Sequence, residues 1–438
     1  MSITVLQKPS EIQPAQSPIV FSVITSGSND YTASGFQYTA NLYVWGNSFT
    51  TEPSYPNSGS YLYQTRKYPN ASGSGIFDFG KLINSALKDL ASENQSNIKY
   101  YAVDFGWQYE SGSTYVTQSG ELTRVSCSVD GWPLVAYDGY ALFPDSINES
   151  LISQSAIFPV MTDAYLVTQS IIETDVSSFG NFASVTSGQS SGSHGISIWR
   201  GQNSAYTASY TIQLTASYTN GTKASGSTSI SNFNPTSSFF PRTFVGHYGF
   251  CPKDPGWTSR FSGVPTASVD SYVFNIVSSA GVNLATLNYK VVCPHYYTPV
   301  RVAFKNRYGQ FDFINFYKRH NETFNTEQRV YQPQLGTWEA STLSYNQFQT
   351  RTQRYIVDAS EVLECNTDWL EEGWNVLMKQ LLVSDEIYWM YDQTDPENVL
   401  VKPLTIQTNS LQFKTHVNNK LIQYTITFDI GQPYKLIL

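Results

Sequence analysis

The chain has 438 residues, which is long for one hydrophobic core and favours roughly two to four domains. Charged residues make up only 14% of the sequence, against about 25% in typical soluble domains. The formal net charge of −8 and the lack of any basic block argue against nucleic-acid binding, which needs clustered Lys and Arg to displace counterions from phosphates.

Aromatic side chains reach 15% and include 31 tyrosines, so the polar surface is built from Ser, Thr, Asn, Gln and Tyr. Such groups cost less to desolvate than charges do, and they suit a surface that neighbouring subunits cover. The alternative is an extracellular β protein with a Ser/Thr-rich face.

The N-terminal segment Met1–Ser17 is polar, contains Pro9 and Pro14, and predicts an extended arm or a frayed terminus. It lacks the charged start and the apolar stretch of a secretory signal. No run in the chain reaches the ~18 apolar residues of a membrane span. We therefore expect a soluble protein that is made in the cytoplasm and has no membrane insertion.

Residues 18–160 have the pattern of a β domain with one helix. Phe36–Trp45 alternates apolar and polar positions with a period of two, which predicts a half-buried strand. Asp78 is placed to cap a helix that packs on the sheet through an apolar stripe. That stripe comprises Phe79, Leu82, Ile83, Ala86, Leu87 and Leu90. Further strands are expected at Ile19–Val23, Ile98–Glu110, Tyr115–Gln118 and Leu122–Val129.

Residues 161–298 are rich in Ser, Thr and Tyr and predict a second, middle β domain. Their composition approaches low complexity, but Tyr206–Tyr218 alternates too well for a pure linker. Further strands are expected at Ser271–Val277 and Ala285–Val292.

Residues 299–438 predict a C-terminal β domain with one helix. The domain begins with an aromatic hairpin, Arg301–Phe304 and Phe311–Tyr317, around the turn Asn306–Gly309. We expect this turn to be structural, with Gly309 at positive φ. Thr367 is placed to cap a helix with the buried stripe Leu370, Trp374, Leu377 and Leu381. Further strands are expected at Glu386–Met390, Val399–Ile406, Leu411–Thr415 and Ile422–Ile430, with a turn at Asn418–Asn419.

The predicted fold class is therefore mainly β, a multi-domain β-sandwich-like architecture with a few amphipathic helices packed on sheets. The predicted parts are an N-terminal arm (1–17), an N-terminal β domain with one helix (18–160), a middle β domain (161–298) and a C-terminal β domain with one helix (299–438).

The cysteine and histidine positions do not indicate a metal site. Cysteines stand at Cys127, Cys251, Cys293 and Cys365, with no CxxC pair, and we expect buried free thiols. Cys293 lies two residues before His295, but a zinc site needs three or four ligands. The histidines, His194, His247, His295, His320 and His416, have no HExxH or other paired spacing.

No phosphate-binding or nucleophile motif is present. The sequence lacks GxSxG, GxxxxGK[ST] and a GxGxxG that follows a strand. The segment Ser72–Gly75 precedes a helix, but it lacks the Lys of a P-loop, which favours a turn. We expect no cofactor.

A glycan hydrolase would need two carboxylates about 5 to 9 Å apart. The candidates are Asp104, Glu110, Asp138, Asp312 and Glu371. Asp104 and Glu110 lie on one strand an even number of residues apart, so they could share a face, but the sequence does not pair the candidates. We assign no catalytic, cofactor-binding or metal residue.

Three segments together resemble structural proteins of tailed bacteriophages, in particular those that infect Bacteroidota, including crAss-like phages. The first joins Ser17–Phe21, Phe36–Tyr38, Leu42–Val44 and Gly75–Asp78; the second is Cys293–Phe316, centred on Phe304–Gly309 and Asp312; the third joins Leu381–Tyr388, Val401–Leu404 and Asn419–Phe428. These patterns of aromatics and turns frame nearly the whole chain.

The resemblance implies a non-enzymatic virion protein, a multi-copy component of a tail, neck or ring assembly, made in the host cytoplasm. Its partners would be further copies of itself in a ring and other tail or portal-proximal proteins. One alternative is a receptor-binding or carbohydrate-binding tail protein that contacts a host surface glycan through loops of the middle domain. A tail-associated glycan hydrolase is a further alternative.

Overall fold

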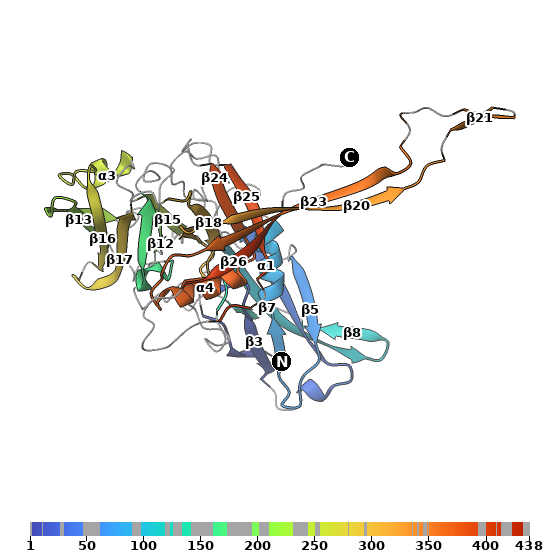
Figure 1. Ribbon diagram of the computed structural model, residues 1–438. Coiled ribbons are helices and arrows are strands. Elements are labelled where there is room, and N and C mark those ends of the chain that lie inside the picture. Colours follow the sequence, from blue (N-terminus) through green and yellow to red (C-terminus); the bar gives the residue numbers. More distant parts are fainter. Residues whose placement is uncertain are drawn as a thin grey trace. The chain divides into compact units, whose positions relative to one another are not determined.

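Figure 1 shows the computed structural model of the chain, which is mostly β, in several sheets, with few helices. This confirms the predicted fold class. The structure describes residues 2–10, 12–26, 30–46, 62–89, 98–118, 123–125, 134–141, 161–172, 195–200, 210–230, 244–249, 255–278, 280–292, 296–334, 336–339, 341–344, 348, 350–392, 400–408, 410–412 and 423–431.

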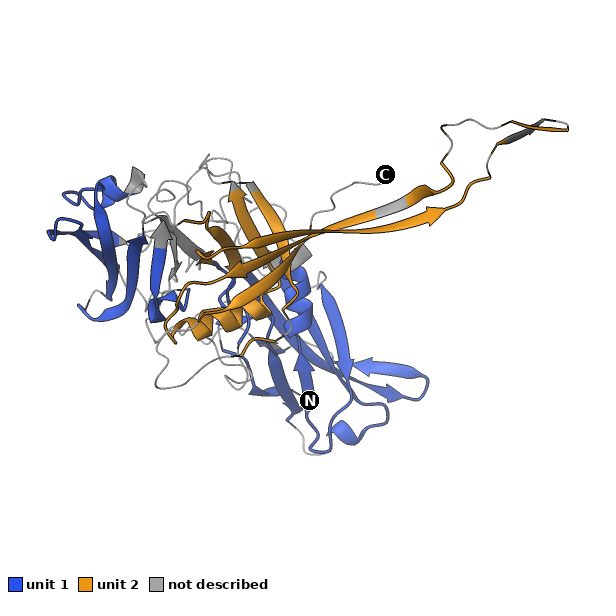
Figure 2. Ribbon diagram, viewed as in Figure 1, with its two compact units in different colours: residues 1–293, 305–312, 394–398 blue, residues 294–304, 313–393, 399–438 orange. Residues whose placement is uncertain are grey.

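The chain divides into two compact units, which Figure 2 shows in blue and orange. Unit 1 comprises residues 1–293, 305–312 and 394–398, and unit 2 comprises residues 294–304, 313–393 and 399–438. The four predicted domains stay a prediction.

Unit 1 begins with two sheets that form a sandwich. The three-stranded sheet has the order β1-β3-β6 and contains β1 (Ile3–Gln7), β3 (Val20–Thr25) and β6 (Gly75–Asp78). The second sheet has the order β2-β10-β7-β4-β5 and contains β2 (Ile12–Pro14), β10 (Leu134–Tyr137), β7 (Ile98–Ser111), β4 (Gln37–Gly46) and β5 (Tyr63–Lys67); β8 (Thr114–Thr117) and β9 (Thr123–Val125) also pair with β7.

The core of the sandwich follows from alternation in the sequence. On β4, the predicted inward positions Tyr38, Ala40 and Leu42 are fully buried. Phe21 of the facing sheet packs on Phe105 of β7, with ring centroids 5.5 Å apart. Tyr43, on the opposite face of β4, is also buried, so this strand is covered on both sides near its end and is not half-buried throughout.

Helix α1 (Gly80–Asp89) covers the same core. The Asp78 carboxylate accepts hydrogen bonds from the backbone N–H groups of Gly80 and Ile19, at 3.0 Å each, so it ties the helix start to the residue that precedes strand β3. Ile83 and Leu87 of the predicted stripe are buried, which confirms its orientation. Leu90 lies outside the described residues.

The N-terminal segment is extended and paired, so of the two alternatives left open by the sequence, an extended arm or a frayed terminus, the frayed terminus is wrong. Strand β1 pairs antiparallel with β3, and β2 pairs parallel with β10. A frayed terminus was considered because of the prolines and polar residues of this segment, but Pro9 and Pro14 are themselves buried. Ile3, Ile12 and Ala15 are also buried, and Ile3 and Ile12 each stand between polar neighbours in the sequence.

A five-stranded sheet occupies the part of unit 1 predicted as the middle domain. Its order is β11-β17-β16-β13-β14, from β11 (Thr168–Ile172), β17 (Asn283–Val292), β16 (Val269–Ser278), β13 (Tyr210–Tyr218) and β14 (Lys223–Ile230). Short elements are η1 (Asp30–Thr32), η2 (Ala164–Leu166), α3 (Pro255–Arg260) and the pair β12 (Gly195–Arg200) with β15 (Phe244–Gly249).

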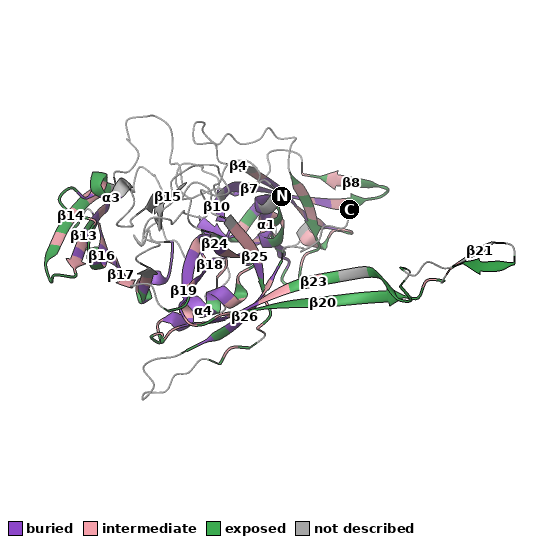
Figure 3. Ribbon diagram, turned by 45° about the horizontal axis from the view of Figure 1, so that its top comes forward, coloured by how far each residue is buried: buried purple, intermediate pink, exposed green. Residues whose placement is uncertain are grey.

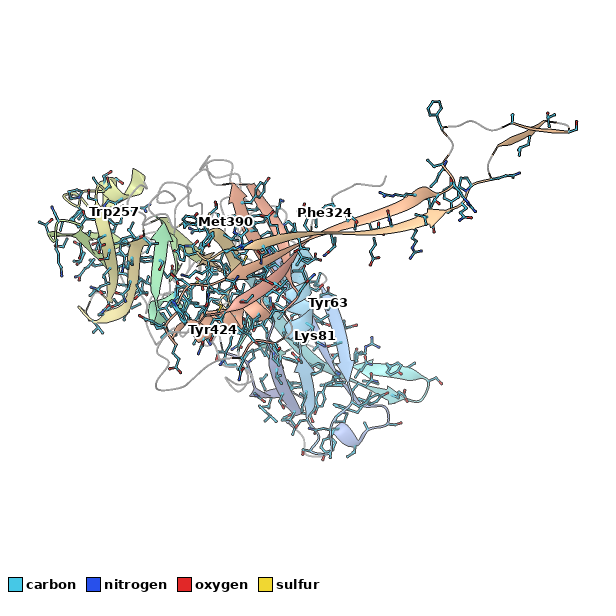
Figure 4. The ribbon with its side chains drawn as sticks, viewed as in Figure 1. Tyr63, Lys81, Trp257, Phe324, Met390 and Tyr424 are labelled. Carbon is cyan, nitrogen blue, oxygen red and sulfur yellow. The ribbon has the colours of Figure 1, made fainter. Side chains whose placement is uncertain are left out.

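Trp257 of α3, which is labelled in Figure 4, is the largest side chain in the core of this sheet. It meets Tyr272 edge to face at 5.4 Å and donates its indole N–H to the carbonyl of Val264. Ile212, Leu214 and Ala216 of β13 are buried on one face, as the alternation predicted. The predicted start of that strand, residues 206–209, lies outside the described residues.

Unit 2 is built on one seven-stranded sheet with the order β19-β18-β24-β25-β26-β23-β20. Its strands are β18 (Val300–Lys305), β19 (Phe311–Phe316), β20 (Asn321–Tyr331), β23 (Gln353–Asn366), β24 (Ile387–Asp392), β25 (Leu400–Ile406) and β26 (Thr425–Ile430). Ile426, Phe428 and Ile430 are buried, which confirms the predicted face of the last strand.

Helix α4 (Trp374–Val383) starts later than the sequence predicted. The side-chain oxygen of Thr367 accepts the backbone N–H of Tyr424 at 2.8 Å, and the Thr367 N–H bonds the Tyr424 carbonyl. Thr367 therefore continues the pairing of β23 with the last strand and is not a helix cap. The stripe itself is confirmed for Trp374, Leu377 and Leu381, which are buried.

The sequence analysis missed a long two-stranded ribbon, formed by β20 and β23. In unit 2 it runs out beyond the other strands of the sheet and leads to the small hairpin of β21 (Thr337–Glu339) and β22 (Thr342–Ser344) (Figures 1 and 2). Every residue of β20 is exposed, as the green colour in Figure 3 shows. No face is buried, so no apolar alternation marked the strand.

The helices of the described residues are all too short or too polar to cross a membrane. Predicted elements at Asn418–Asn419 and at most of Leu411–Thr415 lie outside the described residues.

Because the N-terminal segment folds into unit 1, truncating one of its apolar side chains should lower the free energy of unfolding only where that side chain is buried. Ile12→Ala should lower the free energy of unfolding by about 2 to 4 kcal/mol, because Ile12 is only 4% exposed. The matched control is Leu6→Ala, at a side chain 58% exposed, with an expected change below about 0.5 kcal/mol. Chemical denaturation of both variants measures the difference, and equal effects would mean that the segment is not folded in.

Candidate functional site

Residues 305–312, which we call the Asn306 loop, lie in a buried polar cluster of unit 1. Within unit 1 the Asn306 loop contacts two segments that are distant in the sequence, residues 137–140 and 161–163. Two acidic residues from those segments, Asp138 and Asp163, contact the loop, and a third, Asp312, belongs to the loop itself.

Asn306 organises the loop and is itself almost fully buried. Its side-chain oxygen accepts the backbone N–H groups of Tyr308 and Gln310, both at 3.0 Å. Its side-chain nitrogen donates to the Met161 carbonyl and to Asp312, both at 3.0 Å. Asparagine supplies two donors and an oxygen that accepts twice, so all four bonding positions of this side chain are used.

Gly309 adopts φ +74°, which confirms the structural turn expected there. A Cβ at this position would lie 1.9 Å from the carbonyl oxygen of Asp138. A Cβ on Gly139, in turn, would lie 2.3 Å from the carbonyl oxygen of Arg307. The backbone N–H of Tyr140 bonds that same Arg307 carbonyl at 3.0 Å. Two backbone segments thus approach so closely that each needs glycine.

A buried ion pair closes one side of the loop. The Lys305 ammonium pairs with the Asp138 carboxylate, and the side-chain nitrogen of Gln16 donates to the other Asp138 oxygen at 3.0 Å. Burial makes an unpaired charge costly, so removing one partner would destabilise unit 1 more than removing both.

Asp163 and Arg307 form a second ion pair on the other side. The Arg307 Nε lies 2.8 Å from one Asp163 oxygen, and the Tyr308 hydroxyl donates to the other at 3.1 Å. Burial, followed by the nearby Asp163 charge, raises the pKa of the Tyr308 phenol above its ordinary value. The phenol therefore stays a hydrogen-bond donor at any physiological pH.

Asp312 is the unusual carboxyl of the cluster. It is 7% exposed, and burial raises its pKa to about 7, although hydrogen bonds from Asn306 and Thr162 act in the opposite direction. Thr162 Oγ1 donates to one oxygen at 2.7 Å, and Asn306 Nδ2 donates to the other at 3.0 Å. The nearby Asp163 charge adds to the rise in pKa.

A raised carboxyl pKa is also a property of general acids in glycan hydrolases. A general acid must reach the substrate, however, and both Asp312 oxygens already accept hydrogen bonds from side chains of the same cluster. The partners of Asp138 likewise belong to the loop and to the N-terminal segment. The geometry therefore favours a structural part for both carboxyls.

The other three carboxylates predicted as candidates, Asp104, Glu110 and Glu371, lie elsewhere in the fold. Asp104 is buried in the middle of β7, whereas Glu110 lies near the exposed end of that strand and accepts the Tyr115 hydroxyl at 3.0 Å. Glu371 is an exposed residue of unit 2.

The remaining sequence candidates have structural surroundings or lie outside the described residues. In the turn at Ser72–Gly75, the Asn70 side chain accepts the N–H groups of Ser72 and Ser74, so this is a local Asx-type turn. Cys365 is a buried free thiol. Outside the described residues lie Cys127, Cys251, Cys293, His194, His295 and His416. Where the chain is described, no three acidic, His or Cys side chains gather closely enough to hold a metal ion.

Sequence reasoning found the loop but missed Thr162 and Asp163. These two residues bond partners that stand 150 and 144 positions further along the chain. A single Thr-Asp pair beside a predicted domain boundary carries no periodic signal, so no local pattern could have found it.

No protein-family model matches this chain, and no curated protein matches it either.

Because Gly309 lies so close to the Asp138 backbone, a side chain at position 309 should destabilise the protein more than its positive φ alone would. Gly309→Ala should lower the free energy of unfolding by about 3 kcal/mol or more, because its Cβ overlaps the Asp138 carbonyl. Gly221→Ala is the control, since Gly221 also has positive φ, at +81°, but has open space around its Cβ position. There we expect a loss of about 1 kcal/mol. Equal losses in denaturant unfolding would contradict the close approach.

The raised pKa of Asp312 predicts a pH dependence of stability. The folded state holds the proton of the Asp312 carboxyl more tightly than the unfolded state does. The contribution of this carboxyl to the free energy of unfolding is therefore complete below about pH 4 and is lost as the pH rises to about 7. Asp312→Asn keeps the shape and removes the titration. The stability of the variant relative to the wild type should therefore increase between about pH 4 and 7 and then level off. A difference that is constant with pH would show that Asp312 is not shifted.

Proposed function

We propose that this chain is a non-enzymatic virion structural protein, a multi-copy component of a phage tail, neck or ring assembly. Its partners would be further copies of itself and neighbouring tail or portal-proximal proteins. Its place would be the virion, after synthesis in the host cytoplasm.

The exposed β20–β23 ribbon is the observation that carries this proposal. An isolated two-stranded ribbon is only marginally stable in water, and exposed strand edges promote pairing with other chains. Natural proteins keep such edges short or cover them, yet β20 extends over 11 residues with every side chain exposed. A long ribbon of this kind is well suited to contact with a neighbouring chain.

The composition supports the same proposal. A surface with few charges loses less hydration free energy when neighbouring subunits bury it, because hydroxyl and amide groups are cheaper to desolvate than ions. The buried ion pairs of the Asn306 loop would keep unit 1 fixed in shape, as a subunit with several neighbours requires.

A second candidate function is glycan binding, which one observation favours. Tyr296 is 96% exposed, and its ring lies edge to face with the exposed Tyr297 at 5.3 Å. Exposed aromatic rings without a covering layer are common in surfaces that bind sugars by stacking, and they also anchor protein interfaces. These tyrosines belong to the segment where the receptor-binding alternative places its function.

The mass of the particle in solution tests the two candidates. Light scattering after size exclusion, with negative-stain images of the same peak, should show closed rings of identical copies. A chain that stays a compact monomer or trimer and binds a glycan array, with binding lost in Tyr296→Ala, would instead favour the receptor-binding candidate.

A further inference from the structure

Where the chain is described, the β20–β23 ribbon has two open strand edges, one on each side. Strand β20 pairs with β23 and with no other strand in the described part of the chain. Strand β23 pairs with β26 along Glu361–Asn366, so among the described residues its outer part, residues 353–360, pairs with β20 alone. Each open edge presents backbone N–H and C=O groups that a further strand could bond.

Neither face of the ribbon is built to be covered by a layer. All of β20 is exposed, and the described side chains of residues 353–360 are exposed or half-buried. Phe324, which is labelled in Figure 4, is the one phenylalanine of β20 and stands among Glu, Thr, Asn and Gln. A neighbour is therefore better accommodated at an edge than on a face.

The charges on the ribbon are arranged unfavourably in a single chain. Glu327 stands directly opposite Asp358 in the register of the two strands. Like charges in this position destabilise a strand pair. None of the ion pairs among the described residues involves either carboxylate. Arg329 lies two residues further along β20, on the same face as Glu327, and its own cross-strand partner is the apolar Ile356.

We propose that ribbons of neighbouring copies pair edge to edge, with β20 of one copy antiparallel to the outer part of β23 of the next. An offset of two residues from the register within one ribbon places Arg329 opposite Asp358 of the neighbouring copy. Because two is an even number, both strands keep their faces. The Asp358 carboxylate, which faces Glu327 in its own chain, then gains an opposite charge from the next chain.

This pairing fits a ring of identical copies. Within one ribbon β20 and β23 are antiparallel, so β20 beside the next copy's β23 leaves both ribbons pointing in the same direction. Each copy offers one edge of each kind, so the contact is heterologous and can close around a rotation axis. The offset between neighbours corresponds to the stagger that strands need when they close into a barrel. The inference rests on the proposed multi-copy function and specifies its contact.

Cysteine cross-linking between two different variants tests the pairing. Arg329→Cys protein is mixed with Asp358→Cys protein under assembly conditions and oxidised mildly. Both variants also carry Ser in place of Cys127, Cys251 and Cys293, so that the new thiol is the reactive one beside the buried Cys365. We expect a band of two chains on a denaturing gel from the mixture, and none from either variant alone, because directly opposite positions on paired strands are close enough for a disulfide. The control mixture uses Arg66→Cys, at an exposed arginine of β5, with Asp358→Cys.

The outcomes separate this inference from the proposed function. Assembly of the wild type without the specific cross-link overturns the ribbon pairing and leaves the multi-copy proposal standing. Cross-linking of Arg329→Cys to itself, or equal cross-linking in the Arg66→Cys control, also overturns it. A wild-type chain that does not associate at any attainable concentration overturns both.

Charge exchange gives an independent readout of the offset. Arg329→Glu alone and Asp358→Arg alone should each reduce the assembled fraction by about tenfold or less, since exposed ion pairs are weak and fix register more than affinity. The double variant should recover most of the assembled fraction. A double variant that assembles no better than the two single variants would contradict the pairing of these two residues.

Discussion

The structure of unit 1 depends on one close approach between two backbone segments. Gly309 and Asp138 pass within a distance that no side chain at position 309 could tolerate, and Gly139 approaches Arg307 in the same way. Around this contact, Asn306 uses all its bonding positions, and Lys305 and Arg307 pair with acids from distant parts of the sequence. A buried network of this kind rigidifies its surroundings only when every member is satisfied.

The cluster and the ribbon have opposite physical characters, and each suits a different task. The Asn306 loop is buried, charged and matched internally, so it preserves the shape of unit 1. The ribbon is exposed and carries a like-charge pair. Among the described residues its two edges are open, so their backbone N–H and C=O groups are available to bond a further strand. The subunit role that we propose would use both the rigid unit and the open edges, and the small fraction of charged residues, 14%, would reduce the desolvation cost of contacts with neighbouring copies.

The sequence predicted several of the elements that bury one face, although it did not predict strands β6 and β10. The alternation in β4, β13 and β26 and the stripe of α1 located strands and a helix whose apolar positions the structure buries. Prediction from the sequence failed where a segment has no apolar periodicity. The ribbon lacks a buried face, and Thr367 resembles a helix cap but pairs with Tyr424. In the N-terminal segment, residues 12–15 are all buried, polar Gln13 and Pro14 included, so no apolar alternation marked them. The turn at Asn306–Gly309 was predictable from its residues, whereas its partners, Asp138 and Asp163, were brought to it by the tertiary fold alone.

Hydrogen exchange of the backbone amides, compared between the free chain and the multi-copy assembly that we propose, tests the account most directly. The amides of Tyr308 and Gln310, which bond the Asn306 side chain, should exchange slowly in both states. The amides on the open edge of β20 should exchange rapidly in the dissociated chain and slowly in the assembly, because a neighbouring strand then bonds them. Equal exchange along β20 in both states would contradict a structural role carried by this ribbon.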